Sequence, residues 1–365
     1  MLRRAPLLLL IYFFAGHHLH AQDLAGIEIH GFATQGFLFS SHNNYLTMRS
    51  SSGSLQWTDG AVSVTDSLTD NLRVGIQLHM YELGQLGGPN IQVDWASGDY
   101  RVNDYFGIRA GKVKTPLGLF NDSQDVDAIF LWILLPQGAY PIDNKDFFLA
   151  PVGGEVYGTL PLGDRAGKVL YRGYAGYNQL DTRGGYIQSL YDAGIAFKNP
   201  PGGKTYGGDL RWQTPLTGLT LGASELVQAL DGTSPTGGLH VPPAPVIAEY
   251  GQFSRGKFYI AGEYRRQTTN ATLTFASVTY PSPTDERIWY MRWEVIDWQR
   301  SFNSEATTAT TWMKTMEARG SLEIIPKTGR SLDATTLTFI ATAKWRATSY
   351  MERIWATTRA RIQMA

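Results

Sequence analysis

Two stretches decide the fold: residues 169–180 read VLYRGYAGYNQL, and residues 257–267 read KFYIAGEYRRQ. In the first, Arg172 and Asn178 share one side of an extended strand, and the opposite side carries apolar, aromatic and small residues. In the second, Glu263 lies on the side of the strand that carries most of the polar residues. Successive side chains on a strand point to opposite faces. Each stretch therefore has a face suited to water and a face suited to lipid, as in a transmembrane β-barrel.

Short turns alternate with longer segments along the same region of the chain. The short turns are at 65–71, 101–104, 162–167, 214–218 and 254–257, and the long loops at 40–53, 181–187, 230–243 and 268–285. Twelve strands are predicted between them: 27–39, 54–64, 72–83, 91–101, 105–116, 153–161, 168–180, 189–198, 205–214, 218–228, 245–253 and 257–268. A soluble β-sandwich or propeller is the alternative, but its strands usually run for about five or six residues. Longer strands with alternating faces favour an all-β, antiparallel transmembrane barrel.

The composition excludes several classes of protein. Of the 365 residues, 43% are hydrophobic and 18% charged, with 39 Gly, 19 Tyr and no cysteine. The 32 Lys and Arg residues equal the 32 Asp and Glu residues. These numbers argue against a disulfide scaffold, a cysteine-ligated metal site and a polycationic partner for nucleic acid.

The N-terminal stretch MLRRAPLLLLIYFFAGHHLHA (1–21) has the pattern of a signal peptide. Two arginines precede an apolar core, and a small residue, Ala21, stands at the expected cleavage position. The longest apolar run elsewhere, AIFLWILL (128–135), is too short to span a bilayer as a helix. We therefore expect an exported protein, and the strand pattern favours the bacterial outer membrane.

A long segment of about 36 residues, 117–152, interrupts the hairpins. The motifs around it are GKVKTPLGLFND (111–122), LLPQGAYPID (134–143) and GGEVYG (153–158), with HGFATQGF (30–37), YGGDLRWQTPLTGLTLGAS (206–224) and FYIAGEYRR (258–266) elsewhere. Over about 22–286, the chain resembles outer-membrane porins of the phosphate-selective-porin-like (porin O/P, DcaP-like) superfamily.

The resemblance implies a barrel of about 16–18 strands in the intact family, commonly a homotrimer, that lets small hydrophilic solutes or ions diffuse passively. It also implies contact with membrane lipid and lipopolysaccharide. In a porin, a segment folded into the lumen narrows the pore and its charges set selectivity. We expect residues 117–152 to have this role. A barrel without a channel, used for adhesion or structure, is the alternative.

Charged residues before and within the insert are the candidate pore-lining set. A basic cluster precedes it, and acidic residues follow along it with one lysine: Arg109, Lys112, Lys114, Asp122, Asp125, Asp127, Asp143, Lys145 and Asp146. Ordinary ion pairs of a solvated rim are the alternative interpretation. Strict alternation separates Arg109 from Lys112 and Lys114, so all three line the lumen only if a bulge or the strand end intervenes. Residues 22–285 carry 18 basic and 24 acidic residues, which gives no reason to transfer phosphate selectivity.

Enzyme chemistry has little support in the sequence. The four histidines after the leader are His30, His42, His79 and His240, and none has paired metal-ligand spacing. A barrel hydrolase would need a serine beside a histidine, for which His79 is the only loose candidate. We predict a protein that is not an enzyme and that needs no metal or cofactor.

The last part of the chain, 287–365, departs from this pattern. Glycine occurs 37 times up to Asp285 and twice afterwards, while tryptophan rises from four to six. Codons can be chosen for residues 291–302 and 344–352 such that a frame starting one base earlier reads as alternating, strand-like sequence. Tryptophan and methionine have one codon each, which limits this choice. We hypothesise a frame-shifted C-terminal segment, an incomplete barrel and poor assembly of the chain as written. A separate C-terminal segment, disordered or helical, is the alternative.

Overall fold

The structure is a computed structural model that describes residues 26–41, 43–44, 47–124, 135–192, 194–195, 197–235, 237–275, 278–295, 337–347 and 357–364. Its strands are β1 (Ile27–Ser40), β2 (Ser54–Ser67), β3 (Leu72–Leu83), β4 (Leu86–Arg101), β5 (Gly107–Lys112), β6 (Val152–Pro161), β7 (Lys168–Gln179), β8 (Gly202–Gln213), β9 (Leu219–Thr233), β10 (Gly237–Arg255), β11 (Phe258–Phe275), β12 (Val278–Val295), β13 (Leu337–Ala347) and β14 (Thr357–Met364). They form one antiparallel sheet in which β1 to β12 follow chain order and β13 and β14 lie beyond β1. The predicted all-β, antiparallel fold is confirmed.

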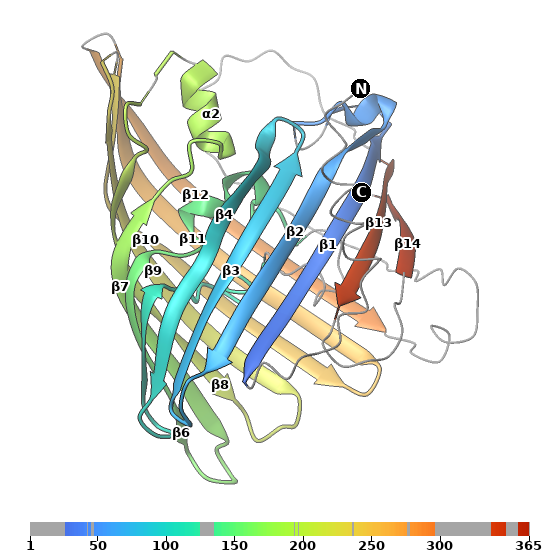
Figure 1. The fold of residues 1–365 in the computed structure, drawn as a ribbon, viewed down its shortest axis with the longest axis vertical. Coiled ribbons are helices and arrows are strands. Elements are labelled where there is room, and N and C mark those ends of the chain that lie inside the picture. The colour runs from blue at the N-terminus through green and yellow to red at the C-terminus, as the bar shows by residue number, and fades with distance from the viewer. Residues whose placement is uncertain are drawn as a thin grey trace.

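The sheet curls so that β1–β4 and β10–β12 form facing walls (Figure 1). One end, here called the turn end, has the short connections after β2, β4, β6, β8 and β10. The other, the loop end, has the longer segments, including the 3-10 helix η2 (Ser50–Ser52) and helix α2 (Gly185–Asp192), together with the short connections after β3 and β9. On β11, Ala261, Glu263 and Arg265 are buried on the inner face, while Phe258 and Tyr264 are exposed outside. The predicted alternation of this strand is thus present.

One predicted strand is wrong. Where the structure describes residues 189–198 they are not strand, because α2 occupies Gly185–Asp192 and residues 194–195 and 197–198 have no regular structure. Ile187 and Leu190 lie three residues apart, which places them on one helix face. They pack in a cluster with Leu180 and Leu230, so burial at the loop end stabilises helix where the sequence alone resembled a strand.

Two predicted loops are also largely strand. Residues 230–243 and 268–285 belong mostly to the long hairpins of β9–β10 and β11–β12. The pairing of β11 with β12 runs without interruption from Phe275↔Val278 to Phe258↔Val295. The prolines and small polar residues that suggested loops lie in these ladders, and β10 shows register irregularities between His240 and Val246. Neighbouring strands outweigh local turn preference there.

The chain between β5 and β6 crosses the inner face of the sheet. Leu117 packs against Leu226 and Val246 of β9 and β10, and Ile142 packs on a cluster that includes Trp57 of β2. A short 3-10 helix, η4 (Ile142–Phe147), lies in the returning half. The predicted insert therefore contacts both walls from inside.

The domain boundaries stay predictions. The 1–21 leader lies outside the described residues. Strand β12 crosses the predicted boundary at 286/287 with continuous pairing, and β13 pairs with β1. Among the described strands, no ladder joins β12 to β14. No helix in the described ranges is long and apolar enough to cross a membrane. The frame-shift hypothesis and the family strand number stay predictions.

Candidate functional site

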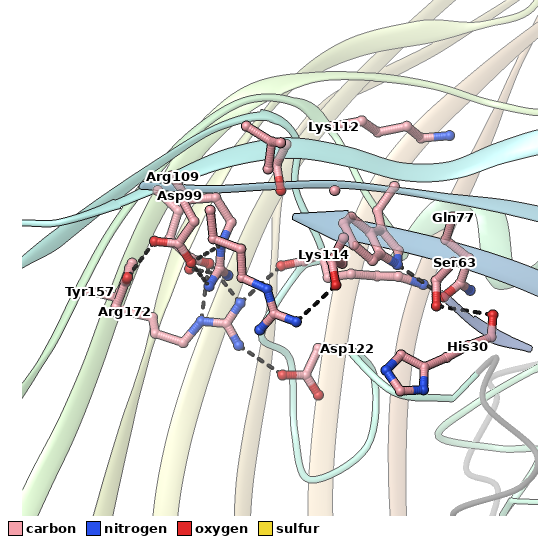
Figure 2. Close-up of a pocket in the computed structure, with 17 residues that line it drawn as sticks. His30, Ser63, Gln77, Asp99, Arg109, Lys112, Lys114, Asp122, Tyr157 and Arg172 are labelled. Carbon is pink, nitrogen blue, oxygen red and sulfur yellow. Dashed lines mark hydrogen bonds and ion pairs between the residues drawn. The ribbon is translucent and has the colours of Figure 1, made fainter. Parts of the chain in front are cut away.

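A cavity of about 600 Å³, here called the turn-side cavity, opens on the inner face of β1–β7 near the turn end. Five basic and three acidic residues are among the 17 that line it (Figure 2). Arg73 is the second residue of β3 and Arg109 the third of β5, so both lie close to the turns. Inner-face charges of this kind are expected where a sheet borders water.

Four strands, β4 to β7, share one largely buried ion-pair network in this cavity. The guanidinium of Arg109 contacts Asp99 Oδ2 at 2.7 Å and Glu155 Oε1 at 2.9 Å. Arg172 contacts the other oxygen of Glu155, Oε2, at 2.7 Å. The Glu155 side chain is fully buried between the two arginines. The Tyr157 hydroxyl donates a hydrogen bond to Asp99, and the Tyr157 ring lies under the Arg109 guanidinium. The pairing of β4, β5 and β6 brings these residues side by side.

The three predicted basic residues line one cavity, as Figure 2 shows. The strand end intervenes as the alternation argument required: Gly111 has a φ of +129°, and a Cβ there would lie 2.2 Å from the Ala96 carbonyl. Lys114 pairs with Asp94, and Lys112 donates to the Val93 carbonyl at 2.7 Å. A register shift between β3 and β4 lets Asp94 face inward on the strand that also carries Asp99.

The acidic residues of the insert that the structure describes, Asp122, Asp143 and Asp146, lie at different places. Asp122 reaches the wall and pairs with Arg172 at 2.8 Å. Lys145 is buried elsewhere, with its ammonium 4.2 Å from the centre of the Tyr81 ring. The backbone of Asp143 lies against Gly185. The predicted residues Asp125 and Asp127 lie outside the described residues.

A second cavity of about 340 Å³, here called the loop-side cavity, lies between the insert and the loop ends of β3, β4 and β7. Lys112 lines both cavities. Asp146 accepts the Asp181 backbone N–H at 2.8 Å, and Asn178 donates to the Asp146 and Phe147 carbonyls. Burial raises the pKa of Asp146 to about 7. This carboxyl is therefore partly protonated near neutral pH.

The far wall holds the insert through β11. Glu263 accepts the Tyr140 hydroxyl at 2.5 Å and the Leu119 N–H at 3.3 Å. Arg265 donates to the Ala139 carbonyl and stacks over the Phe148 ring. Burial, then the Glu263 charge, raises the pKa of Tyr140 well above its usual range, so its hydroxyl stays a donor.

Gly118 permits this approach of the insert to β11. It has a φ of +66°, and a Cβ there would lie 2.4 Å from Glu263 Oε1.

Several residues of the candidate site were not in the predicted set. Asp99, Glu155 and Arg172 complete the turn-side network, and Glu263 and Arg265 hold the insert. Their inward direction follows from alternation, but which strand stands beside which residue is set by register. In the sequence, nothing distinguishes the buried Glu155 from the exposed charged residues of the turns.

No protein-family model matches the chain, and no curated protein matches it either. Solved structures of bacterial outer-membrane proteins are similar at low identity. A loop L8 deletion mutant of OmpT, an outer membrane protein of Vibrio cholerae, is 12% identical over 88% of this chain and 93% of its own, with a TM-score of 0.36. The trimer form of OmpT is 11% identical over 93% and 94%, with a TM-score of 0.35. A mutant of Rh. blastica porin is 11% identical over 73% and 94%, with a TM-score of 0.35.

Proposed function

We propose that the protein is a bacterial outer-membrane porin through which small hydrophilic solutes or ions diffuse passively. The observation that carries the proposal is the insert, which is fastened across the inner face beside a charged cavity of about 600 Å³. A folded segment that narrows a charged lumen is how a porin limits solute size and filters ions.

The outer face supports a membrane location. Val62, Ile76 and Leu78 are exposed large apolar side chains that point away from the lumen on β2 and β3. Exposed apolar residues in such number are unfavourable in water and suit contact with lipid. Partners on this proposal are membrane lipid and lipopolysaccharide outside, and the permeating solute inside.

The finer resemblance to the phosphate-selective-porin-like superfamily stays a hypothesis. Each arginine of the turn-side network has carboxylate partners, Asp99, Glu155 or Asp122. The arginine charges in this part of the lumen are therefore largely compensated, and the proposal assigns no phosphate selectivity.

We also propose a role without catalysis. His79 is buried and contacts Asp59, with 2.6 Å between Nε2 and Oδ1. This pair provides no nucleophile of its own. Within the described ranges, no group of three or more metal-ligating side chains was found.

Single-channel recording tests the channel function. The full chain is isolated from outer membranes or refolded in detergent, checked for heat-modifiable migration and added to a planar bilayer. Stepwise conductance is expected from the fraction of the chain that folds, together with efflux of small solutes from liposomes. A folded, heat-modifiable barrel that neither conducts nor releases solutes would contradict the porin function and favour the adhesive or structural alternative.

A further inference from the structure

The outward face of β9–β12 carries charged side chains midway along its strands. The outward face of β2 and β3 carries none there. Ser224, Leu226, Ala248 and Tyr250 are buried inside, so Glu225 and Glu249, between them, point outward, and both are exposed. On β11 and β12, Arg266, Asp285 and Arg287 are also outward, with side chains 47%, 45% and 59% exposed.

These acidic residues lie well within the height that lipid covers in a barrel. Glu225 is six residues above the start of β9, and Glu249 six residues above the turn end of β10. At about 3.3 Å per residue and a tilt of about 45°, six residues rise about 14 Å. An outer-membrane barrel has an apolar band about 25 Å tall. The carboxylates therefore lie near the middle of that band.

The opposite wall shows what a lipid-facing surface looks like in this chain. Leu78 is also six residues from the turn end of its strand, β3. The outward residues of β2 and β3 between Asp66 and Glu82 are all uncharged: Val64, Val62, Gly60, Thr58, Val74, Ile76, Leu78 and Met80. Height alone thus does not explain the charges on β9–β12.

The charges are arranged by sign across the sheet. Glu225 and Glu249 lie on β9 and β10, and neither has an ion-pair partner within the described ranges. Arg266 and Arg287 lie on β11 and β12 beside Asp285. The register places Arg266 opposite Ile247, which is itself opposite Glu225. One side of the patch is acidic and the other carries both arginines.

We propose that this charged patch is the contact surface for a second copy of the chain. Copies in one membrane share one orientation, so a rotation about the membrane normal keeps residues at the same height. When two such walls face each other, β9 and β10 of one protomer approach β11 and β12 of the next. Glu225 and Glu249 of one protomer then pair with Arg266 and Arg287 of its partner. The contact removes from lipid the charges that a lone barrel would expose to it.

The proposal rests on the proposed membrane location, and the absence of cysteine from the chain makes both testable together. Tyr264→Cys reports on the patch, because Tyr264 lies opposite Glu249. Leu78→Cys is its matched control. Both positions are six residues from the turn end, and they are 38% and 41% exposed. Each is labelled with a fluorophore and reconstituted with phospholipid that carries a nitroxide in its acyl chain.

The expected result is strong quenching at position 78 and protection at position 264. Adding Glu225→Arg and Glu249→Arg raises quenching at 264 to the level at 78, and light scattering in detergent shows the mass of a single chain. Adding Arg266→Glu and Arg287→Glu to that variant restores the oligomer mass and the protection. Equal quenching at both positions without the charge changes would overturn the interface.

Failure of the membrane location gives a different result. A chain that is quenched at neither position and lacks heat-modifiable migration contradicts the barrel itself and the interface with it. Loss of conductance with quenching at 78 and protection at 264 contradicts the channel function but supports the interface.

Discussion

The two cavities of the lumen are built in different ways. The turn-side cavity is walled mainly by strands, although Asp122 of the insert also lines it. Asp99, Arg109 and Glu155 come from β4, β5 and β6, and the strand ladder fixes their positions. The loop-side cavity has the insert as one wall, through Lys145, Asp146 and neighbouring residues. Charges fixed by strand pairing keep their places while the barrel stays folded. Charges placed by a docked segment change when that segment moves.

Loss of Glu155 should give the largest effect and show that the turn-side network belongs to the wall. Glu155→Ala leaves Arg109 and Arg172 without their shared buried carboxylate. Removing one partner of a buried ion pair costs at most about 3–5 kcal/mol, and here Asp99 and Asp122 still compensate part of the arginine charge. We expect the heat-modifiable band to be lost at a clearly lower temperature and urea concentration.

Asp164→Asn, in an exposed turn, is the control for this change and should leave both midpoints unchanged. Equal stability of the Glu155→Ala barrel and the unsubstituted chain would mean that the network is a solvated rim, as the alternative sequence interpretation held.

Loss of Glu263 should affect the insert more than the barrel. Glu263→Ala removes the acceptor for the Tyr140 hydroxyl and the Leu119 N–H. Leaving buried donors unpaired costs about 1–3 kcal/mol, and that cost falls on the docked insert. We expect higher single-channel conductance and faster proteolysis within 119–140, with strand stability lowered less than by Glu155→Ala.

Glu82→Gln, an exposed carboxylate on the outward face of β3, is the matched control and should conduct like the unsubstituted chain. If Glu263→Ala instead unfolded the barrel and left no conducting state, the insert and the strands would not be separable in stability. The distinction between a cavity formed by strands and one formed by the docked insert would then be wrong.

Much of the fold was predictable from local pattern, and the site much less so. Alternation in 169–180 and 257–267 was enough to assign inner and outer faces, because the period of two is a property of each strand alone. It was not enough to pair Glu155 with both Arg109 and Arg172, because register joins residues 46 and 17 positions apart. Helix α2 was missed because its stability comes from burial against Leu180 and Leu230. The insert was found by its length, but its contacts to Glu263 had no local signal.

A pH series should separate the two cavities through Asp146. Burial raises the pKa of this carboxyl to about 7, while an undocked aspartate keeps an ordinary value near 3.9. The docked form then binds more protons between about pH 4 and pH 7, so docking is strongest at low pH and weakens as pH rises through that window. Above about pH 7 no further loss is expected.

We expect conductance and protease access to the insert to rise from pH 4 to pH 7. Asp146→Asn should flatten this dependence, because the amide oxygen still accepts the Asp181 N–H without taking a charge. Asp192→Asn, exposed at the end of α2, should retain it. An unchanged slope in Asp146→Asn would assign the pH response to another group.

Lys112 gives the smallest expected effect, and it tests whether the two cavities lie on one path. It is the basic residue that lines both, and its ammonium donates to a carbonyl, Val93 O, rather than to a carboxylate. Lys112→Gln should shift the reversal potential in a salt gradient toward cation preference, with stability nearly unchanged. Lys168→Gln, exposed at the turn end, removes the same charge outside both cavities and should shift it less. If solutes pass only through space away from β5, the two variants will give the same reversal potential. That result would mean that the permeating ion does not meet the wall that carries the turn-side network.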